Sequence, residues 1–156
     1  MINTAIFAAG CFWGIEEKFL SFEGVVETEV GYVGGKTIHP TYQDVCAGDT
    51  YHAEAVRVHF DDELVTYDDL LGLFFNIHNP TQLNRQGPDY GTQYRSAIFY
   101  LDEFQKMSAQ NKIKNLNELV YSGDIVTSIE KASEFWLAEE YHQKYIRKKK
   151  QSGIFG

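Results

Sequence analysis

Strand and helix patterns alternate along the first part of the chain, and this alternation constrains the fold most. The apolar run NTAIFAAG, residues 3–10, has β-branched and aromatic members and ends in glycine, which is typical of a buried strand. The next run, CFWGIEEKFLSF at residues 11–22, has apolar side chains on one face at helical spacing and charged side chains on the other. GVVETEVGYVGG, residues 24–35, alternates apolar and polar positions as a strand does. The pattern predicts a two-layer domain in which helices pack on a sheet.

The rest of the chain continues the mixture without a repeat, a low-complexity segment or a linker. Further strands are predicted at 54–61, 97–101 and 124–132, and further helices at 66–78, 102–119 and 137–150. Thr66 has the position of a helix N-cap and is followed by acidic residues. Residues 36–51 and 79–96 have no period and are expected to form long ordered loops, which are usually functional in compact domains. With 156 residues, we expect one domain, 1–156, of the α+β or α/β class.

Charge and composition argue against several classes of protein. The formal net charge of −8 repels phosphate backbones and anionic lipid heads, so neither nucleic acid nor a membrane is expected as a partner. Two cysteines without a CxxC motif cannot form a disulfide scaffold or a zinc site, and no metal or cofactor is expected. We interpret the basic residues 147–150 as favourable charge near the end of a helix. The sequence shows no secretory leader and no run of membrane-spanning length, so we expect a cytoplasmic protein with reduced thiols.

Cys11 lies where the first predicted strand passes into the first predicted helix. A thiol at the start of a helix meets the positive end of the helix dipole and free backbone N–H groups, which favour the reactive thiolate. Gly10 would allow the turn, and Gly14 would leave space near the thiol. Phe12 and Trp13 would supply an apolar wall. Cysteine is also among the most buried residue types, so position alone leaves Cys11 as either a nucleophile or a packing residue.

The two predicted loops and the strand between them supply polar groups that a reactive thiol could use. These groups are Tyr42, His52, Glu54, Asp89, Tyr90 and Tyr94. Each one alone is explained as a packing, solvated or capping residue, but their concentration around glycine-rich turns favours a functional site. Cys46 has no comparable helix start, and a structural role is favoured for it.

Six motifs occur in one order along the chain: GCFWG, GYVGG, PTYQDVCAG, HAEAV, GTQYRSAI and AEEYHQKY. Together they closely resemble peptide methionine sulfoxide reductase A, over nearly the whole chain from Ala5 to about Tyr145. The resemblance implies an α+β fold, a two-layer α/β sandwich with a ferredoxin-like core, a mixed sheet and long ordered loops. It also implies reduction of methionine-S-sulfoxide, free or in proteins, as protein repair under oxidative stress.

The resemblance assigns the nucleophile and the residues that hold the substrate. Cys11 would attack the sulfoxide sulfur, and Phe12 with Trp13 would form the pocket for the S-methyl group. The first half-reaction would release methionine and leave a sulfenic acid on Cys11.

The resemblance also assigns the polar side of the site. Glu54 would be the acid, the phenols of Tyr42 and Tyr94 would hydrogen-bond the sulfoxide oxygen, and Asp89 would complete this side. Attack on the sulfur drives negative charge onto a poor leaving oxygen, so a proton donor must act as the S–O bond weakens. Glu54 can do so only if it stays protonated near pH 7, which burial in an aromatic pocket could achieve.

A second thiol must then reduce the sulfenic acid on Cys11. Longer members of the family carry resolving cysteines near the C-terminus, whereas the final residues here, QSGIFG, contain none. Either Cys46 is the resolving thiol, or an external thiol acts directly: thioredoxin, glutaredoxin or a small thiol. We favour the external thiol because Cys46 matches a family position that is usually not used for recycling.

We expect the protein to act as a monomer.

Two other functions are alternatives to this one. A cysteine hydrolase would need a histidine such as His52 or His142 within hydrogen-bond reach of Cys11, and no signature of such enzymes surrounds Cys11. A binding domain with an aromatic groove for methionine-rich segments would need neither a nucleophile nor a buried acid. The histidines are interpreted first as hydrogen-bonded structural residues, and His142 with Tyr141 and Glu139 could brace the site from the predicted final helix.

Overall fold

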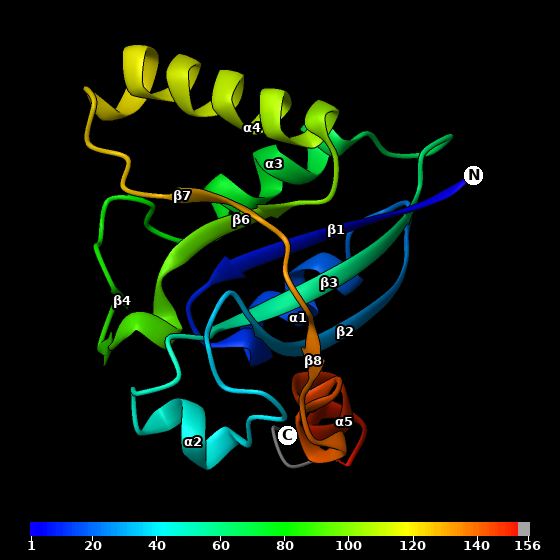
Figure 1. Ribbon diagram of the computed structural model, residues 1–156. Coiled ribbons are helices and arrows are strands. Elements are labelled where there is room, and N and C mark those ends of the chain that lie inside the picture. The colour runs from blue at the N-terminus through cyan, green and yellow to red at the C-terminus, as the bar shows by residue number, and fades with distance from the viewer. Residues whose placement is uncertain (153–156) are drawn as a thin grey trace.

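The computed structural model describes residues 1–152, and residues 153–156, the end of the expected domain, lie outside the described residues. Its main feature is a six-stranded sheet with the strand order β7-β6-β1-β3-β2-β8 (Figure 1). The strands of this sheet are β1 (Ile2–Ala9), β2 (Val25–Val33), β3 (Ala53–Asp61), β6 (Ser96–Tyr100), β7 (Ser128–Lys131) and β8 (Trp136–Leu137). A separate pair consists of β4 (Arg85–Gln86) and β5 (Asp89–Tyr90).

The helices are α1 (Phe12–Leu20), α2 (Tyr42–Cys46), α3 (Tyr67–Asn76), α4 (Glu103–Leu116) and α5 (Tyr145–Gln151). Shorter helical turns are η1 (Thr92–Tyr94), η2 (Asn117–Tyr121) and η3 (Glu140–His142). No helix in the described part of the chain is both long enough and apolar enough to cross a membrane.

Four central strands and two helices form a ferredoxin-like β-α-β-β-α-β unit. Along the chain the unit runs β1-α1-β2-β3-α3-β6, and in the sheet its strands lie in the order β6-β1-β3-β2. All neighbouring strands within the unit are antiparallel. β7 adds to β6 in parallel, which makes the whole sheet mixed. The expected α+β fold with a ferredoxin-like core and a mixed sheet is confirmed.

Helices α1 and α3 cover one face of the sheet and bury the main hydrophobic core. The ring of Phe7 in β1 stacks on Phe19 of α1 and on Phe74 of α3, with ring centroids 5.0 and 5.3 Å apart. Ile6, the preceding residue of β1, is buried in a second, smaller cluster, as expected for the opposite face of the sheet. Figure 1 shows the chain between β7 and β8 crossing in front of β1 and β3, and Phe135 of this segment packs on the second cluster. Burial of side chains on both faces explains the continuous apolar run of β1.

Both segments predicted as long loops contain short regular elements. Thr66 caps α3 as expected. Within residues 36–51, however, Thr41 and Asp44 form a second capping box, which starts the short helix α2. Residues 79–96 likewise contain the β4-β5 pair and η1 between stretches of ordered loop.

The helix predicted at 137–150 is wrong in its first half. Residues there form β8 and η3, and α5 begins only at Tyr145. Lys144 has a left-handed backbone conformation with φ 53°, which interrupts any helix running through it. The side chain of Gln143 bonds both the N–H and the C=O of Val30, so hydrogen bonds to the sheet replace those of a helix.

Candidate active site

Cys11 lies at the sharp turn where β1 ends and α1 begins. It is the N-cap residue of α1, its side chain makes no capping hydrogen bond, and the residue is half-buried. The turn depends on Gly10, whose φ of 100° lies in the region that favours glycine. A Cβ atom at Gly10 would come within 2.9 Å of the side chain of Gln86 in β4, which covers the turn. The local structure therefore holds the thiol at the start of the helix.

Glu54 is a buried carboxyl beside this helix start. It lies in β3 opposite Tyr32 of β2, and only 1% of it is exposed. Its Oε1 accepts a hydrogen bond of 3.3 Å from the backbone N–H of Phe12, while Oε2 has no partner among the described residues. Burial, helped by the charge of Asp89, raises the pKa of Glu54 to about 8 although the Phe12 N–H lowers it. The carboxyl therefore holds its proton at neutral pH, as a proton donor must.

The Cys11 thiol is also protonated at neutral pH. Burial raises its pKa to about 11, the charges of Glu54 and Asp89 add to the rise, and the backbone N–H of Trp13 only partly opposes it. The expectation that the helix start would favour the thiolate is wrong for the resting protein. Phe12, the next residue, is 1% exposed, so the start of α1 lies in the core, where desolvation outweighs the helix dipole.

Two phenols and a second acid complete the cluster around Cys11. Burial and the charge of Glu54 raise the pKa of Tyr94, the last residue of η1. Burial also raises the pKa of Tyr42, the first residue of α2, and the charge of Glu54 contributes there too. Asp89 lies in β5, and its charge raises the pKa of both Cys11 and Glu54. The structure thus brings these five side chains together from distant parts of the chain, and we call them the Cys11 cluster.

Phe12 and Trp13 differ in exposure. Phe12 is buried, with its ring centroid 6.5 Å from that of Tyr42 and 5.2 Å from that of His142. Trp13 is half-buried, and its ring stacks on Tyr145 of α5 with 3.9 Å between centroids. Trp13 Nε1 also donates a hydrogen bond of 2.9 Å to Nδ1 of His142. Phe12 is therefore part of the buried wall of the cluster, whereas Trp13 keeps ring surface accessible.

The stretch before α5 braces the cluster. Glu139 accepts one hydrogen bond of 2.8 Å from the hydroxyl of Tyr32 and one of 2.9 Å from the backbone N–H of Tyr42. His142 is fully buried, and because its Nδ1 accepts from Trp13, the neutral ring carries its proton on Nε2. The motif AEEYHQKY indicated bracing by Glu139 and His142, but no signal in the sequence identified Tyr32 as the hydrogen-bond partner of Glu139.

The histidines do not provide the base of a cysteine hydrolase. His52 accepts at Nδ1 from the backbone N–H of Gly35 at 3.0 Å, and its Nε2 lies 2.7 Å from the carbonyl oxygen of Thr37. His142 is engaged with Trp13. Among the hydrogen bonds of the described residues, neither histidine is bonded to Cys11.

Cys46 and Cys11 are both free thiols. Cys46 is exposed at the last residue of α2, one helical turn from Tyr42. Its charge contributes to the raised pKa of Cys11, so the two thiols belong to one neighbourhood. Within residues 1–152, no group of three or more histidine, cysteine, aspartate or glutamate side chains is placed to hold a metal ion.

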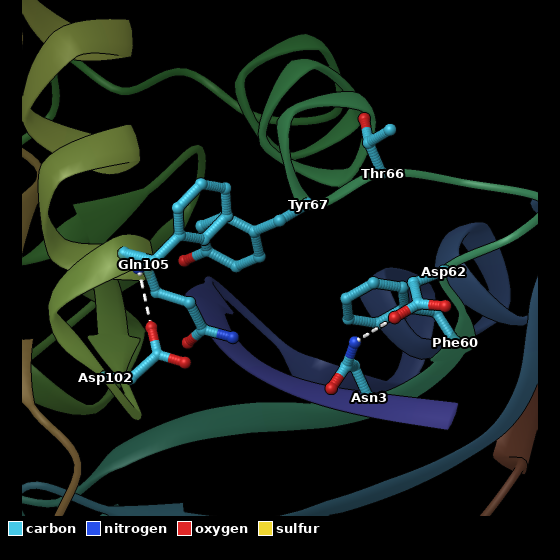
Figure 2. Close-up of a pocket in the computed structure, with 8 residues that line it drawn as sticks. Asn3, Phe60, Asp62, Thr66, Tyr67, Asp102 and Gln105 are labelled. Atoms are coloured by element: carbon cyan, nitrogen blue, oxygen red, sulfur yellow. Dashed lines mark hydrogen bonds between the residues drawn. The ribbon is translucent and has the colours of Figure 1, made fainter. Parts of the chain in front are cut away.

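A cavity of about 260 Å³ lies apart from the Cys11 cluster. Figure 2 shows Asn3 hydrogen-bonded to Asp62 on one side of it and Asp102 bonded to the backbone of Gln105 on the other. Its remaining lining residues are Phe60, Thr66, Tyr67 and Phe104. No member of the Cys11 cluster lines this cavity, so the chemistry of the cluster does not involve it.

Comparison with known proteins agrees with the motifs. The sequence model of the family described as Peptide methionine sulfoxide reductase matches residues 3–155. The chain belongs to this family. Peptide methionine sulfoxide reductase MsrA of Methanosarcina acetivorans is 55% identical to it over 149 residues, which are 95% of this chain and 79% of that one.

Solved structures give the same answer for the fold. The reduced form of Mxr1 from Saccharomyces cerevisiae has a TM-score of 0.90 at 35% identity, and the match covers 96% of this chain and 87% of that one. Mxr1 in complex with Trx2 has a TM-score of 0.66 at 23% identity, covering 92% of this chain and 84% of that one. Membership of the peptide methionine sulfoxide reductase family makes the chain an oxidoreductase and confirms the resemblance carried by its six motifs.

Proposed function

We propose that this chain reduces methionine-S-sulfoxide, free or within proteins, with Cys11 as the nucleophile and Glu54 as the acid. The observation that carries the proposal is a buried, protonated carboxyl held at the same helix start as the thiol. Family membership supports the reaction, and this pairing suggests how the chain performs it. The biological role that fits is repair of oxidised proteins.

The first half-reaction moves the sulfoxide oxygen onto Cys11. The sulfur of Cys11 attacks the sulfoxide sulfur while Glu54 gives its proton to the sulfoxide oxygen. The attack joins the two sulfurs, and the S–O bond of the substrate breaks as its oxygen takes the proton from Glu54. This oxygen then bonds to the Cys11 sulfur while the S–S bond breaks and its electron pair leaves with methionine, so Cys11 becomes a sulfenic acid that carries the oxygen and the donated proton. Cys11 enters this step as the thiolate, after losing its proton to solvent, so Glu54 is ionised when the step ends and regains a proton from solvent.

The other cluster members bind the substrate in this proposal. Tyr42 and Tyr94 donate hydrogen bonds to the sulfoxide oxygen, and their raised pKa values keep both phenols protonated as donors. Asp89 completes the polar side, and its charge adds to the effect of burial in raising the pKa of Glu54. Trp13 and Phe12 hold the S-methyl group on the apolar side, with Trp13 presenting the accessible ring.

An external thiol reduces the sulfenic acid on Cys11 in the second half-reaction. Two electrons from thioredoxin, glutaredoxin or a small thiol restore the Cys11 thiol, and the oxygen leaves as water while the reductant becomes a disulfide. The complex of the yeast relative Mxr1 with Trx2 supports thioredoxin as this partner. Cys46 is the alternative resolving thiol, since it is exposed and lies in the same neighbourhood as Cys11.

Cys11→Ser tests the central assignment. Without reductant, the wild-type protein is expected to form a stoichiometric amount of methionine from methionine-S-sulfoxide, and to turn over once dithiothreitol is added. Cys11→Ser should form none, whereas the matched variant Cys46→Ser should keep the single turnover. Methionine formation by Cys11→Ser would overturn the assignment.

Residues 1–156 act as one domain and as a monomer in this proposal. The support is that residues of one chain supply the whole Cys11 cluster, from the six-stranded sheet, the separate β4-β5 pair, α2 and η1.

A further inference from the structure

A groove of about 550 Å³ lies along α5, beside Trp13. Its lining residues are Tyr141, Tyr145, Lys148, Lys149 and Ser152. Tyr145 connects the groove to Trp13, the residue proposed to hold the S-methyl group, because the two rings stack with 3.9 Å between centroids. Tyr141 is 59% exposed, and Figure 1 shows α5 at the edge of the molecule below β8. The residues beside a methionine sulfoxide bound at Trp13 are therefore within reach of this groove.

The basic run of α5 has two parts with different environments. Arg147 and Lys150 are both paired with Glu17 of α1, at 3.2 and 3.7 Å. The charges of these two residues are thus partly compensated within the protein. They tie α5 to α1 and lie outside the lining of the groove.

The charges of the two lysines that line the groove are balanced less by neighbouring carboxylates. Lys149 Nζ lies over the ring of Tyr145, 5.3 Å from its centroid. Lys148 Nζ donates a hydrogen bond of 3.0 Å to the backbone oxygen of Glu140, which carries no net charge. It also lies 3.6 Å from a carboxylate oxygen of Glu140, whose side chain is 89% exposed, and such an exposed ion pair contributes little. The groove therefore presents positive charge and aromatic surface together, on a chain whose formal net charge is −8.

We propose that this groove binds acidic residues that flank a methionine sulfoxide in a protein substrate. The inference rests on the proposed function and specifies its substrate class. Tyr141 and Tyr145 offer flat apolar surface to the flanking residues, and Lys148 with Lys149 attracts their aspartate or glutamate side chains. The helix dipole explains cations near the end of α5, but it does not explain why they line an aromatic groove that adjoins Trp13.

The test compares two peptides that differ only in the residues beside one methionine-S-sulfoxide, which are aspartates in one and lysines in the other. The wild-type protein is expected to show a kcat/KM about tenfold higher for the acidic peptide at low ionic strength, and a smaller ratio at about 0.5 M salt. Replacing both groove lysines, Lys148→Glu with Lys149→Glu, should abolish or reverse the ratio.

The matched control replaces Lys106 and Lys114 of α4 by glutamate. Lys106 also lies over a tyrosine, 5.5 Å from the ring centroid of Tyr100, so the control changes net charge equally at a comparable site outside the groove. It should keep the wild-type ratio. An equal fall in the control, no preference in the wild type, or an effect of the groove substitutions on the KM for thioredoxin alone would each overturn the inference. Failure of the wild type to reduce free methionine-S-sulfoxide would instead contradict the proposed function.

Discussion

The Cys11 thiol and the Glu54 carboxyl lose their protons in an order that follows from their burial. Burial raises the pKa of Glu54 to about 8 and that of Cys11 to about 11, and the Glu54 charge itself adds to the second value. Between these two pH values the pair holds one proton. The form that can react, with a thiolate and a protonated acid, belongs to this singly protonated state. Its population is therefore largest from about pH 8 to about pH 11.

Glu54→Gln should change the pH profile of the first half-reaction. For the wild type, kcat/KM of the free enzyme is expected to rise about tenfold per pH unit up to about pH 8, because the fraction of thiolate rises while Glu54 stays protonated. Above about pH 8 it should level off, because the gain in thiolate is then offset by the loss of the Glu54 proton. In Glu54→Gln the rate should be about a hundredfold lower at pH 7, and should rise through pH 8 without levelling.

Glu16→Gln is the control for this experiment. Glu16 is also 1% exposed with a pKa raised by burial, but it bonds Thr28 and the backbone of Lys144 rather than the helix start. The pH profile of Glu16→Gln should keep the change of slope near pH 8.

Reaction of the Cys11 thiol with iodoacetamide would show that the thiol stays accessible in Glu54→Gln. Unchanged single-turnover rates in Glu54→Gln would remove its role as the acid.

At the scale of single residues, the sequence predicted the roles of side chains better than it predicted their burial. The need for a buried, protonated Glu54 could be argued from the reaction, and the structure confirms the raised pKa. The direction in which the pKa of Cys11 shifts could not be predicted. The pattern shows that Cys11 starts a helix, but it does not show that the first turn, with Phe12, is buried in the core. The helix dipole was visible in the sequence, and the larger effect of desolvation was not.

At the scale of elements, the stretch between β8 and α5 is the part that sequence patterns described least well. Its periodic apolar residues read as a helix, but Gln143 bonds β2 and Glu139 bonds the start of α2. These are contacts between residues about a hundred positions apart, and a local pattern carries no information about them. The motif AEEYHQKY predicted that the stretch matters, and only the fold shows that it joins α1, α2 and β2.

Glu139→Ala should loosen α2 and move the phenol of Tyr42. Glu139 accepts hydrogen bonds from the Tyr32 hydroxyl and the Tyr42 backbone N–H, so its removal is expected to lower the free energy of unfolding by about 1–3 kcal/mol. The single-turnover rate with methionine-S-sulfoxide should fall severalfold. Urea unfolding and rapid-quench measurements would test both. The matched variant is Glu140→Ala, whose side chain is 89% exposed, and it should leave both quantities unchanged. Equal behaviour of the two variants would rule out the bracing role of Glu139.

At the scale of the whole molecule, the antiparallel topology explains why the Cys11 cluster exists. Ala9 at the end of β1 pairs with Ser96 at the start of β6, and Val33 at the end of β2 pairs with Ala53 at the start of β3. Phe7 near the end of β1 also pairs with Val56 near the start of β3. Residues just after β1, at the start of β3 and just before β6 therefore meet at one end of the central strands. The pattern alone predicted the strands and the two-layer class but not this register, so the resemblance to a family was needed to connect the loops.

Cys46→Ser tests whether the molecule completes its reaction alone or with a partner. We expect Cys46→Ser to turn over with thioredoxin at close to the wild-type rate, because an external thiol reduces the half-buried Cys11 directly. After one turnover without reductant, both proteins should carry a sulfenic acid on Cys11, trapped with dimedone and identified by mass spectrometry. Turnover with dithiothreitol is the control and should be equal in both. If Cys46→Ser lost most of its thioredoxin-dependent turnover and the wild type formed a disulfide between Cys11 and Cys46, then Cys46 would be the resolving thiol. In that case α2 would supply two functional side chains: the phenol of Tyr42, which binds the substrate, and the thiol of Cys46, which reduces Cys11.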